Sequence, residues 1–300
     1  MKFISFAMDD RQSWGVLDGD AVYDLGRKTG IPTLAHYLAE ADLHQAGALI
    51  DGSVPDARRG EVTLLPVVPT PEKIFCVVRN YTEHHKEMVD AGMNLTLDDY
   101  PPIFLRVWRS LTAHNAPIVI PHVSDTLDWE GELAVIIGKG GRHIPPTQAM
   151  DHVAGYACFN DASVREWQFH AKQIASGKNF ESTGGFGPWL VPAHEVDLAK
   201  GLHLTTRVNG EVVQTASTLQ MIFSIPTLIS YLSTIVTLTP GDVIATGTPS
   251  GVGVSRKPPQ YLKAGDRCEV EIEHVGILMN PIAADTILTP VATTASLDAG

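Results

Sequence analysis

The chain has 300 residues, of which 44% are hydrophobic and 19% charged, and its formal net charge at pH 7 is −12. This acidic balance argues against nucleic acid or an anionic membrane as a partner, because both attract surplus lysine and arginine. No apolar run approaches the roughly 20 residues that a membrane span needs. The N-terminal apolar stretch is soon interrupted by Asp9 and Asp10, which argues against a signal peptide. The three cysteines are widely spaced, as free thiols of a cytoplasmic protein would be.

Residues 1–68 are predicted to form a small N-terminal α/β domain. Segments 2–8 and 14–25 have the composition of short strands separated by polar turns. Pro32 begins a helical pattern in which apolar residues recur near 3.6-residue spacing, namely Leu34, Tyr37, Leu38, Ala41 and Ala46. Three prolines between residues 64 and 73 then indicate a linker.

Residues 69–283 are predicted to form a second, mostly β-stranded domain. Its short segments are rich in β-branched residues and bounded by Gly, Pro or Asp: 74–78, 117–120, 132–138, 155–159, 205–208, 243–246 and 268–275. Asn209-Gly210 predicts a type I′ hairpin, and Ser224 followed by Pro226 predicts the start of a helix. The strands do not alternate regularly with helices, so the predicted class is β-rich α+β. Residues 284–300 are expected to be a flexible tail.

Three acids, Asp128, Glu130 and Glu132, stand at alternate positions just before an apolar strand. Side chains two residues apart on a strand share a face, so these carboxylates are expected to lie together. Three acids on one face repel unless a cation separates them, and hard divalent cations such as Mg²⁺, Mn²⁺ and Ca²⁺ prefer oxygen ligands. The alternative is an acidic, solvated face of an edge strand.

A fourth acid, Asp161, follows the apolar run 155–159 and could end a strand or cap the helix predicted to begin near Ser163. Arg165 lies four residues further on, so it could share a helical face with Asp161. Such an arginine forms either a surface ion pair, worth only about 0–1 kcal/mol, or a clamp for a substrate carboxylate.

At these residues the sequence resembles the fumarylacetoacetate hydrolase family. Seven landmarks occur in the family's order: residues 73–87, 127–139, 155–166, 177–189, 208–214, 238–253 and 262–276. The resemblance covers residues 73 to 281, nearly the whole second domain. It implies a mixed β-sandwich roll, a homodimer and a more variable N-terminal domain.

The resemblance also implies a set of metal ligands. The family's metal-binding acids fall on Glu130, Glu132 and Asp161, which implies Mg²⁺ or Mn²⁺ with Ca²⁺ as a substitute. Asp128 resembles a position beside these ligands.

The family's catalytic pair falls on His84 and Glu87, which sit on a mobile lid in the family and activate water. On a helix these residues are three apart and can face each other, although a polar surface helix would look the same. Residues 88–102 would continue the lid.

Substrate contacts are implied for Tyr81, Arg165, Gln168 and Thr248, while Lys178 would offset the charge of a developing enolate. Thr248 lies in a glycine-rich turn that lacks the GK[ST] ending of a phosphate loop. Departures from the family pattern are Val78 for glycine, and Glu166 and Glu181 for aspartate. Arg106 stands where many members have lysine, in a segment that lines the family's pocket.

The expected function is hydrolysis of a C–C bond in a 2,4-diketo acid, an acylpyruvate, to pyruvate and a carboxylic acid, in the catabolism of aromatic compounds. His84, oriented by Glu87, would activate water to attack the distal carbonyl. Two alternatives use the same site: decarboxylation of an oxaloacetate-like acid, and isomerisation or hydration of a 2-hydroxymuconate-like acid. Two others involve no catalysis: a protein that binds a keto acid without turning it over, and a purely structural β domain whose acids are surface groups.

Overall fold

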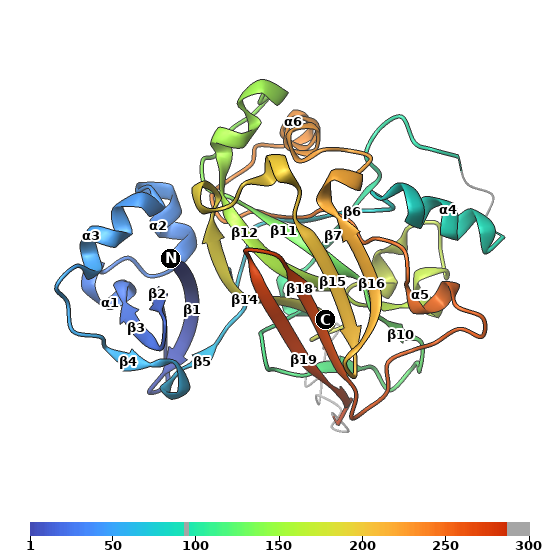
Figure 1. The fold of residues 1–300 in the computed structure, drawn as a ribbon, viewed down its shortest axis with the longest axis horizontal. Helices are drawn as coiled ribbons and strands as arrows, with labels where there is room; N and C mark the ends of the chain where they lie inside the picture. Colours follow the sequence, from blue (N-terminus) through green and yellow to red (C-terminus); the bar gives the residue numbers. More distant parts are fainter. Residues whose placement is uncertain (93–95, 287–300) are drawn as a thin grey trace, which may run out of the picture.

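The computed structural model describes residues 1–92 and 96–286 (Figure 1). Its N-terminal strands and helices, in chain order, are β1 (Lys2–Met8), β2 (Arg11–Asp18), β3 (Ala21–Asp24), α1 (Leu25–Thr29), α2 (Leu34–Glu40), α3 (Ala46–Ile50), β4 (Ala57–Arg58) and β5 (Thr63–Leu64). The next elements are β6 (Ile74–Val77), α4 (Thr82–Asp90), β7 (Ile103–Arg106), β8 (Leu111–Thr112), β9 (Ile118–Ile120), β10 (Leu127–Asp128), β11 (Gly131–Ile137), β12 (Val153–Asp161), β13 (Ser163–Val164) and α5 (Arg165–Gln168). The remainder are β14 (Gly184–Pro192), β15 (His203–Val208), β16 (Glu211–Ser217), α6 (Ile225–Ile235), β17 (Val243–Ala245), β18 (Arg267–Ile272) and β19 (Gly276–Ala284).

Two mixed sheets organise the described chain. The larger has the order β4-β3-β2-β1-β14-β12-β11-β17-β6-β7, with β5 beside β1 and β8 beside β14. The smaller has the order β16-β15-β18-β19-β9, and β10 pairs with β13 alone. The predicted β-rich α+β class is therefore confirmed.

Strand β11 lies at the centre of the larger sheet and is buried on both faces. Leu133, Val135 and Ile137 pack into the core shared with α6 and the smaller sheet. Ala134 and Ile136 face the core shared with the N-terminal helices. This alternation follows from the two-residue period of a strand, and it places Glu132 on the same face as Ala134.

The N-terminal segment extends the larger sheet, because β1 pairs with β14 through Phe3 and Leu190 (Figure 1). The strands predicted for residues 2–8 and 14–25 are present. The predicted helix is shorter than its pattern, because α2 ends at Glu40 and the next residue, Ala41, is extended with φ −147° and ψ 159°. The domain boundary at residue 68 stays a prediction.

Other local predictions are confirmed. Asn209 and Gly210 have φ of 52° and 84° in the turn between β15 and β16, as a type I′ turn requires. Ser224 caps α6 by accepting a hydrogen bond from the Thr227 amide. Strand β19 extends to Ala284, the first residue of the predicted tail, and residues 287–300 lie outside the described chain.

Candidate metal centre and its lid

The three predicted metal ligands meet where β11 begins and β12 ends. Glu130 immediately precedes β11, Glu132 lies within it, and Asp161 is the last residue of β12. The two strands are antiparallel with Gly131 opposite Asn160, so the start of one adjoins the end of the other. One carboxylate oxygen from each acid lies within 4.8 Å of the others, and all three side chains are buried. The alternative of a solvated acidic face is therefore wrong.

Asp128 does not join this cluster, because the predicted continuous strand is interrupted. Strand β10 ends at Asp128 and β11 begins at Gly131. The fully buried Asp128 carboxylate instead accepts hydrogen bonds from Arg165 Nε at 2.8 Å and from the amides of Gly253 and Val254 at 2.8 and 2.9 Å.

The predicted helical face shared by Asp161 and Arg165 is also absent. Asp161 belongs to β12, while α5 begins only at Arg165 and its N-cap is Val164, so Asp161 does not cap that helix. Arg165 reaches Glu130 instead, with 2.6 Å between Nη1 and Oε1. The arginine is 4% exposed, which excludes a surface ion pair.

Lys178 and Arg106 contribute further positive charge to the cluster. Lys178 Nζ lies 2.7 Å from Glu130 Oε2 and 2.7 Å from Asp161 Oδ2. It is 2% exposed and therefore not a solvated loop lysine. Arg106 Nε lies 2.5 Å from Asp161 Oδ1. Burial alone would raise the pKa of Glu130, but the charges of Lys178 and Arg165 outweigh it and lower that pKa to about 2.

When all of its acids are ionised, the site carries one more negative charge than positive charge, which suits a cation. The three acids of the cluster and the neighbouring Asp128 are four buried carboxyl groups that face three buried cationic side chains, Arg106, Arg165 and Lys178. Glu132 accepts a hydrogen bond from the Gly247 amide at 2.9 Å and has no cationic partner among the described residues. Burial, with the negative charges of Asp161 and Glu130, raises its pKa well above the ordinary value. Three convergent carboxylates with one uncompensated charge fit a hard divalent cation.

The turn after β17 directs two backbone amides at acidic side chains. Gly247 and Gly251 have φ of 99° and 103°, a left-handed conformation that favours glycine. The Gly247 amide donates to Glu132 and the Gly251 amide to Glu87, both at 2.9 Å. The glycine-rich sequence therefore connects the acidic cluster to the predicted lid.

Helix α4 carries the predicted catalytic pair. Its residues His84 and Glu87 are three apart on one face, and His84 Nδ1 lies 2.9 Å from Glu87 Oε2. His84 is 6% exposed, so its side chain faces the protein and not the solvent. Glu83, Lys86 and Asp90 on the same helix are exposed, so α4 is a surface helix that buries His84, and the catalytic role of the pair stays a prediction. Residues 93–95 of the predicted lid continuation lie outside the described chain.

Some of the predicted substrate residues have polar atoms without a hydrogen-bond partner among the described residues. Arg165 Nη1 donates to Gln168 Oε1 at 2.9 Å, which brings these two residues together as predicted. Arg165 Nη2 and the hydroxyl of Tyr81 are buried without a hydrogen-bond partner among the described residues. Burial, together with the charge of Glu132, raises the pKa of Tyr81, which indicates that its phenol lies near the acids. These two donors are available to a ligand.

Arg106 and Thr248, in contrast, are engaged by the protein. Besides Asp161, the Arg106 guanidinium donates to Ser110 Oγ, Ala162 O and Thr183 Oγ1. Thr248 Oγ1 accepts from Gln214 Nε2 at 2.8 Å and donates to Gly131 O at 3.0 Å. Both side chains therefore support the site's framework, which local sequence patterns did not reveal.

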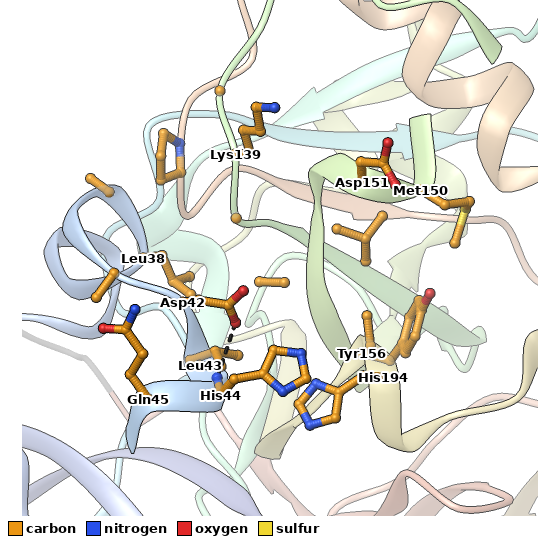
Figure 2. Close-up of a pocket in the computed structure, with 18 of the residues that line it drawn as sticks. Leu38, Asp42, Leu43, His44, Gln45, Lys139, Met150, Asp151, Tyr156 and His194 are labelled. Atoms are coloured by element: carbon orange, nitrogen blue, oxygen red, sulfur yellow. Dashed lines mark hydrogen bonds between the residues drawn. The ribbon is translucent and has the colours of Figure 1, made fainter. Parts of the chain in front are cut away.

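A wide cleft lies away from these acids. It has a volume of about 930 Å³ and is lined by the N-terminal segment and by loops of the main sheet. Figure 2 shows His44 and His194 meeting across it, with ring centroids 3.6 Å apart, and Tyr156 on its wall. None of the acids, cations or lid residues described above lines this cleft.

Fold and site together define a class of protein in which a mixed β-roll carries a cluster of buried acids that could hold a metal ion. Residues 73–283 match the family described as fumarylacetoacetate (FAA) hydrolase C-terminal, and the chain belongs to this family. Human mitochondrial oxaloacetate tautomerase FAHD2A is 43% identical over 254 residues, which cover 83% of this chain and 79% of the human protein.

Solved structures show the same fold. Fumarylacetoacetate hydrolase from Exiguobacterium antarcticum has a TM-score of 0.78 and 35% identity, covering 95% of this chain and 100% of that one. Maleylpyruvate hydrolase from Sphingobium sp. SYK-6, in complex with manganese(II) and pyruvate, has a TM-score of 0.77 and 28% identity, covering 95% and 99%. None of the helices in the described residues is both long and apolar enough to cross a membrane.

Proposed function

We propose that this chain is a metal-dependent enzyme that interconverts the keto and enol forms of a 2-oxo dicarboxylic acid of the oxaloacetate class. The observation that carries the proposal is the buried His84–Glu87 pair on α4, present together with three convergent carboxylates in a chain 43% identical to an oxaloacetate tautomerase. This changes the principal expectation from C–C hydrolysis to proton transfer at the carbon beside the 2-oxo group.

Glu130, Glu132 and Asp161 would hold the cation, which we propose to be Mg²⁺ or Mn²⁺ with Ca²⁺ as a substitute. Such an ion polarises the 2-oxo group and thereby acidifies the neighbouring carbon. The manganese and pyruvate bound to the maleylpyruvate hydrolase support this assignment, because pyruvate is itself a 2-oxo acid.

The chain's own residues perform binding and proton transfer. Arg165, through its unpaired Nη2, binds a substrate carboxylate, and the unpaired Tyr81 hydroxyl donates to a second oxygen. With its Nδ1 proton donated to Glu87, His84 uses Nε2 to remove a proton from C3 of the keto acid. The proton is delivered to the oxygen on C2 to give the enol, and Lys178 offsets negative charge at that oxygen during the transfer. Gln168 orients Arg165 through their hydrogen bond.

The proposal is tested with freshly dissolved enol-oxaloacetate, whose conversion to the keto form is followed by ultraviolet absorbance. We expect purified enzyme with Mg²⁺ or Mn²⁺ to accelerate the conversion above the spontaneous rate, and a chelator to abolish the acceleration. A rate equal to that of metal and buffer alone would contradict tautomerase activity.

A second candidate, hydrolysis of an acylpyruvate, is favoured by the same His84–Glu87 pair, because a histidine held by a carboxylate also activates water. The similarity to maleylpyruvate hydrolase supports it. Metal-dependent release of pyruvate and the matching acid from a panel of acylpyruvates would establish hydrolysis. Pyruvate and carbon dioxide from oxaloacetate would instead establish the decarboxylase alternative. The muconate-type isomerase, the homodimer and the cytoplasmic location remain predictions.

A further inference from the structure

The turn Gly251–Ser255 contacts both the lid and the arginine that we assign to substrate binding. It follows Thr248 and includes the short helical segment Gly253–Ser255. It is contacted by Glu87 on α4 and by Asp128 at the end of β10, both more than 100 positions earlier in the chain. The turn therefore lies between two parts of the site that do not share a secondary-structure element.

On the lid side, the turn holds the oxygen of Glu87 that does not contact His84. Glu87 Oε1 accepts from the Gly251 amide at 2.9 Å and from Ser255 Oγ at 2.5 Å, while Oε2 faces His84. Ser255 Oγ also lies 2.9 Å from Val252 O, but a hydroxyl has one proton, and the charged carboxylate is the stronger acceptor. The orientation of His84 thus depends on the position of the turn.

On the arginine side, Asp128 ties the same turn to Arg165. One carboxylate oxygen, Oδ1, accepts the Gly253 amide, and the other, Oδ2, accepts both the Val254 amide and Arg165 Nε. Asp128 has no exposed surface, so breaking these bonds would leave a buried charge without compensation. Arg165 and the turn are therefore expected to move together.

We propose that Asp128 and Ser255 are positioning residues that couple occupation of Arg165 to the placement of His84. A carboxylate bound at Arg165 Nη2 fixes the guanidinium, Asp128 transmits that position to the amides of Gly253 and Val254, and Ser255 then holds Glu87 and hence α4 in the closed position. The inference rests on the site of the proposed function, but it concerns how that site is assembled and not which reaction follows.

Hydrogen–deuterium exchange of peptides covering residues 82–90 tests the coupling without turnover, with Mn²⁺ and pyruvate as the probe. In wild-type protein we expect saturating pyruvate to slow exchange of α4. In Ser255→Ala we expect α4 to exchange about tenfold faster or more, because one hydrogen bond to a charged group is lost. In Asp128→Asn we expect the exchange rate of α4 to be the same with and without pyruvate. The pyruvate concentration is chosen to saturate this variant.

Kinetics on the proposed substrate provide the second readout. Ser255→Ala should lower kcat about tenfold or more while changing KM little, because the substrate still binds but His84 is misplaced. Ser255→Thr retains the hydroxyl and should restore kcat. Ser250→Ala is the matched control, since this serine lines the same small cleft beside the lid but has no hydrogen bond to Glu87.

The coupling would be overturned if saturating pyruvate did not change the exchange rate of α4 in the wild type. It would also be overturned if pyruvate slowed α4 exchange equally in the wild type and in Asp128→Asn. Unaltered α4 exchange in Ser255→Ala would overturn the role of Ser255. If wild-type enzyme does not tautomerise oxaloacetate but pyruvate still protects α4 through Asp128 and Ser255, the proposed reaction fails and the coupling stands.

Discussion

The acidic floor of the site and the helix above it are built in opposite ways. The floor is formed by Glu130 just before β11, Glu132 within β11 and Asp161 at the end of β12. These two strands are adjacent in the larger sheet, and buried cationic side chains contact Glu130 and Asp161. The predicted lid, α4, is one nine-residue helix whose charged link to the rest of the protein passes largely through Glu87.

This difference separates two requirements of the proposed chemistry. A cation needs ligands held in a fixed geometry, which strands buried on both faces supply. A base that must admit a substrate and then cover it is better placed on an element held by a few breakable bonds. Changes to the floor should therefore affect metal binding, whereas changes to the lid should affect turnover without affecting metal binding.

The largest effect is expected from Glu132→Gln, which removes a ligand carboxylate from the floor. Loss of a residue that only supports a metal ligand lowers metal affinity by roughly 10–100-fold. We expect Glu132→Gln to lower Mn²⁺ affinity by more than this, because Glu132 is itself a proposed ligand, and we expect activity to fall with it. Calorimetric titration with Mn²⁺ measures the loss. Glu211→Gln, at an exposed position on β16, is the control for charge alone. Unchanged Mn²⁺ affinity in Glu132→Gln would show that Glu132 is not a ligand.

The next effect, from His84→Ala, should be confined to the lid. We expect kcat for tautomerisation to fall by about 10²–10⁴-fold, the range typical of a lost general base. Mn²⁺ affinity should remain within about twofold of wild type, because His84 belongs to the lid and is not among the three convergent acids. Steady-state kinetics and metal titration on the same sample make the comparison. A parallel loss of metal binding would remove the distinction between floor and lid.

Arg106→Lys tests the support beneath the floor. The planar guanidinium of Arg106 donates hydrogen bonds to Asp161, Ala162 and Thr183. The single ammonium group of a lysine cannot reproduce this set of bonds. We expect Mn²⁺ affinity to fall about 10–100-fold and kcat at saturating Mn²⁺ to remain near wild type. Arg109→Lys, an exposed neighbour stacked on Trp108, should behave as wild type. If kcat fell while Mn²⁺ affinity held, Arg106 would contact substrate, as the sequence resemblance first implied.

Regular spacing predicted which candidate residues lie together, and the family resemblance supplied their expected roles. The alternation of acids predicted that Glu130 and Glu132 lie together, and helical spacing predicted that His84 faces Glu87. Asn209-Gly210 determined a hairpin because both positions need positive φ. In each case the relevant contact spans few residues or follows one period.

The remainder depends on contacts between distant segments. The alternation failed at Asp128, because the chain leaves the strand at Trp129 and Glu130 and turns Asp128 toward Arg165. Ser255 lies 168 residues from Glu87, so no spacing rule connects them. Thr248 was expected to bind substrate, but its hydroxyl is used by Gln214 and Gly131.

The smallest predicted effect is a pH dependence of lid docking. Burial raises the pKa of Glu87, but hydrogen bonds from His84, Ser255 and the Gly251 amide outweigh it, and the net pKa is lowered. A lowered pKa means that the ionised carboxylate stabilises the folded, docked form. That contribution is complete above the ordinary glutamate pKa of about 4.3 and is lost as pH falls through the lowered value.

The stability difference between wild type and Glu87→Gln isolates this contribution, because every other titrating group is common to both proteins. We expect a difference of about 1–2 kcal/mol in the free energy of unfolding above about pH 5, shrinking toward zero as pH falls below about 4. Urea unfolding across that range measures it. A difference that grew on acidification would mean that protonated Glu87 makes the stronger contacts. Helix α4 would then be held in place by a neutral Glu87. In that case the hydrogen bonds from Gly251 and Ser255 to Glu87 would not be charge-assisted.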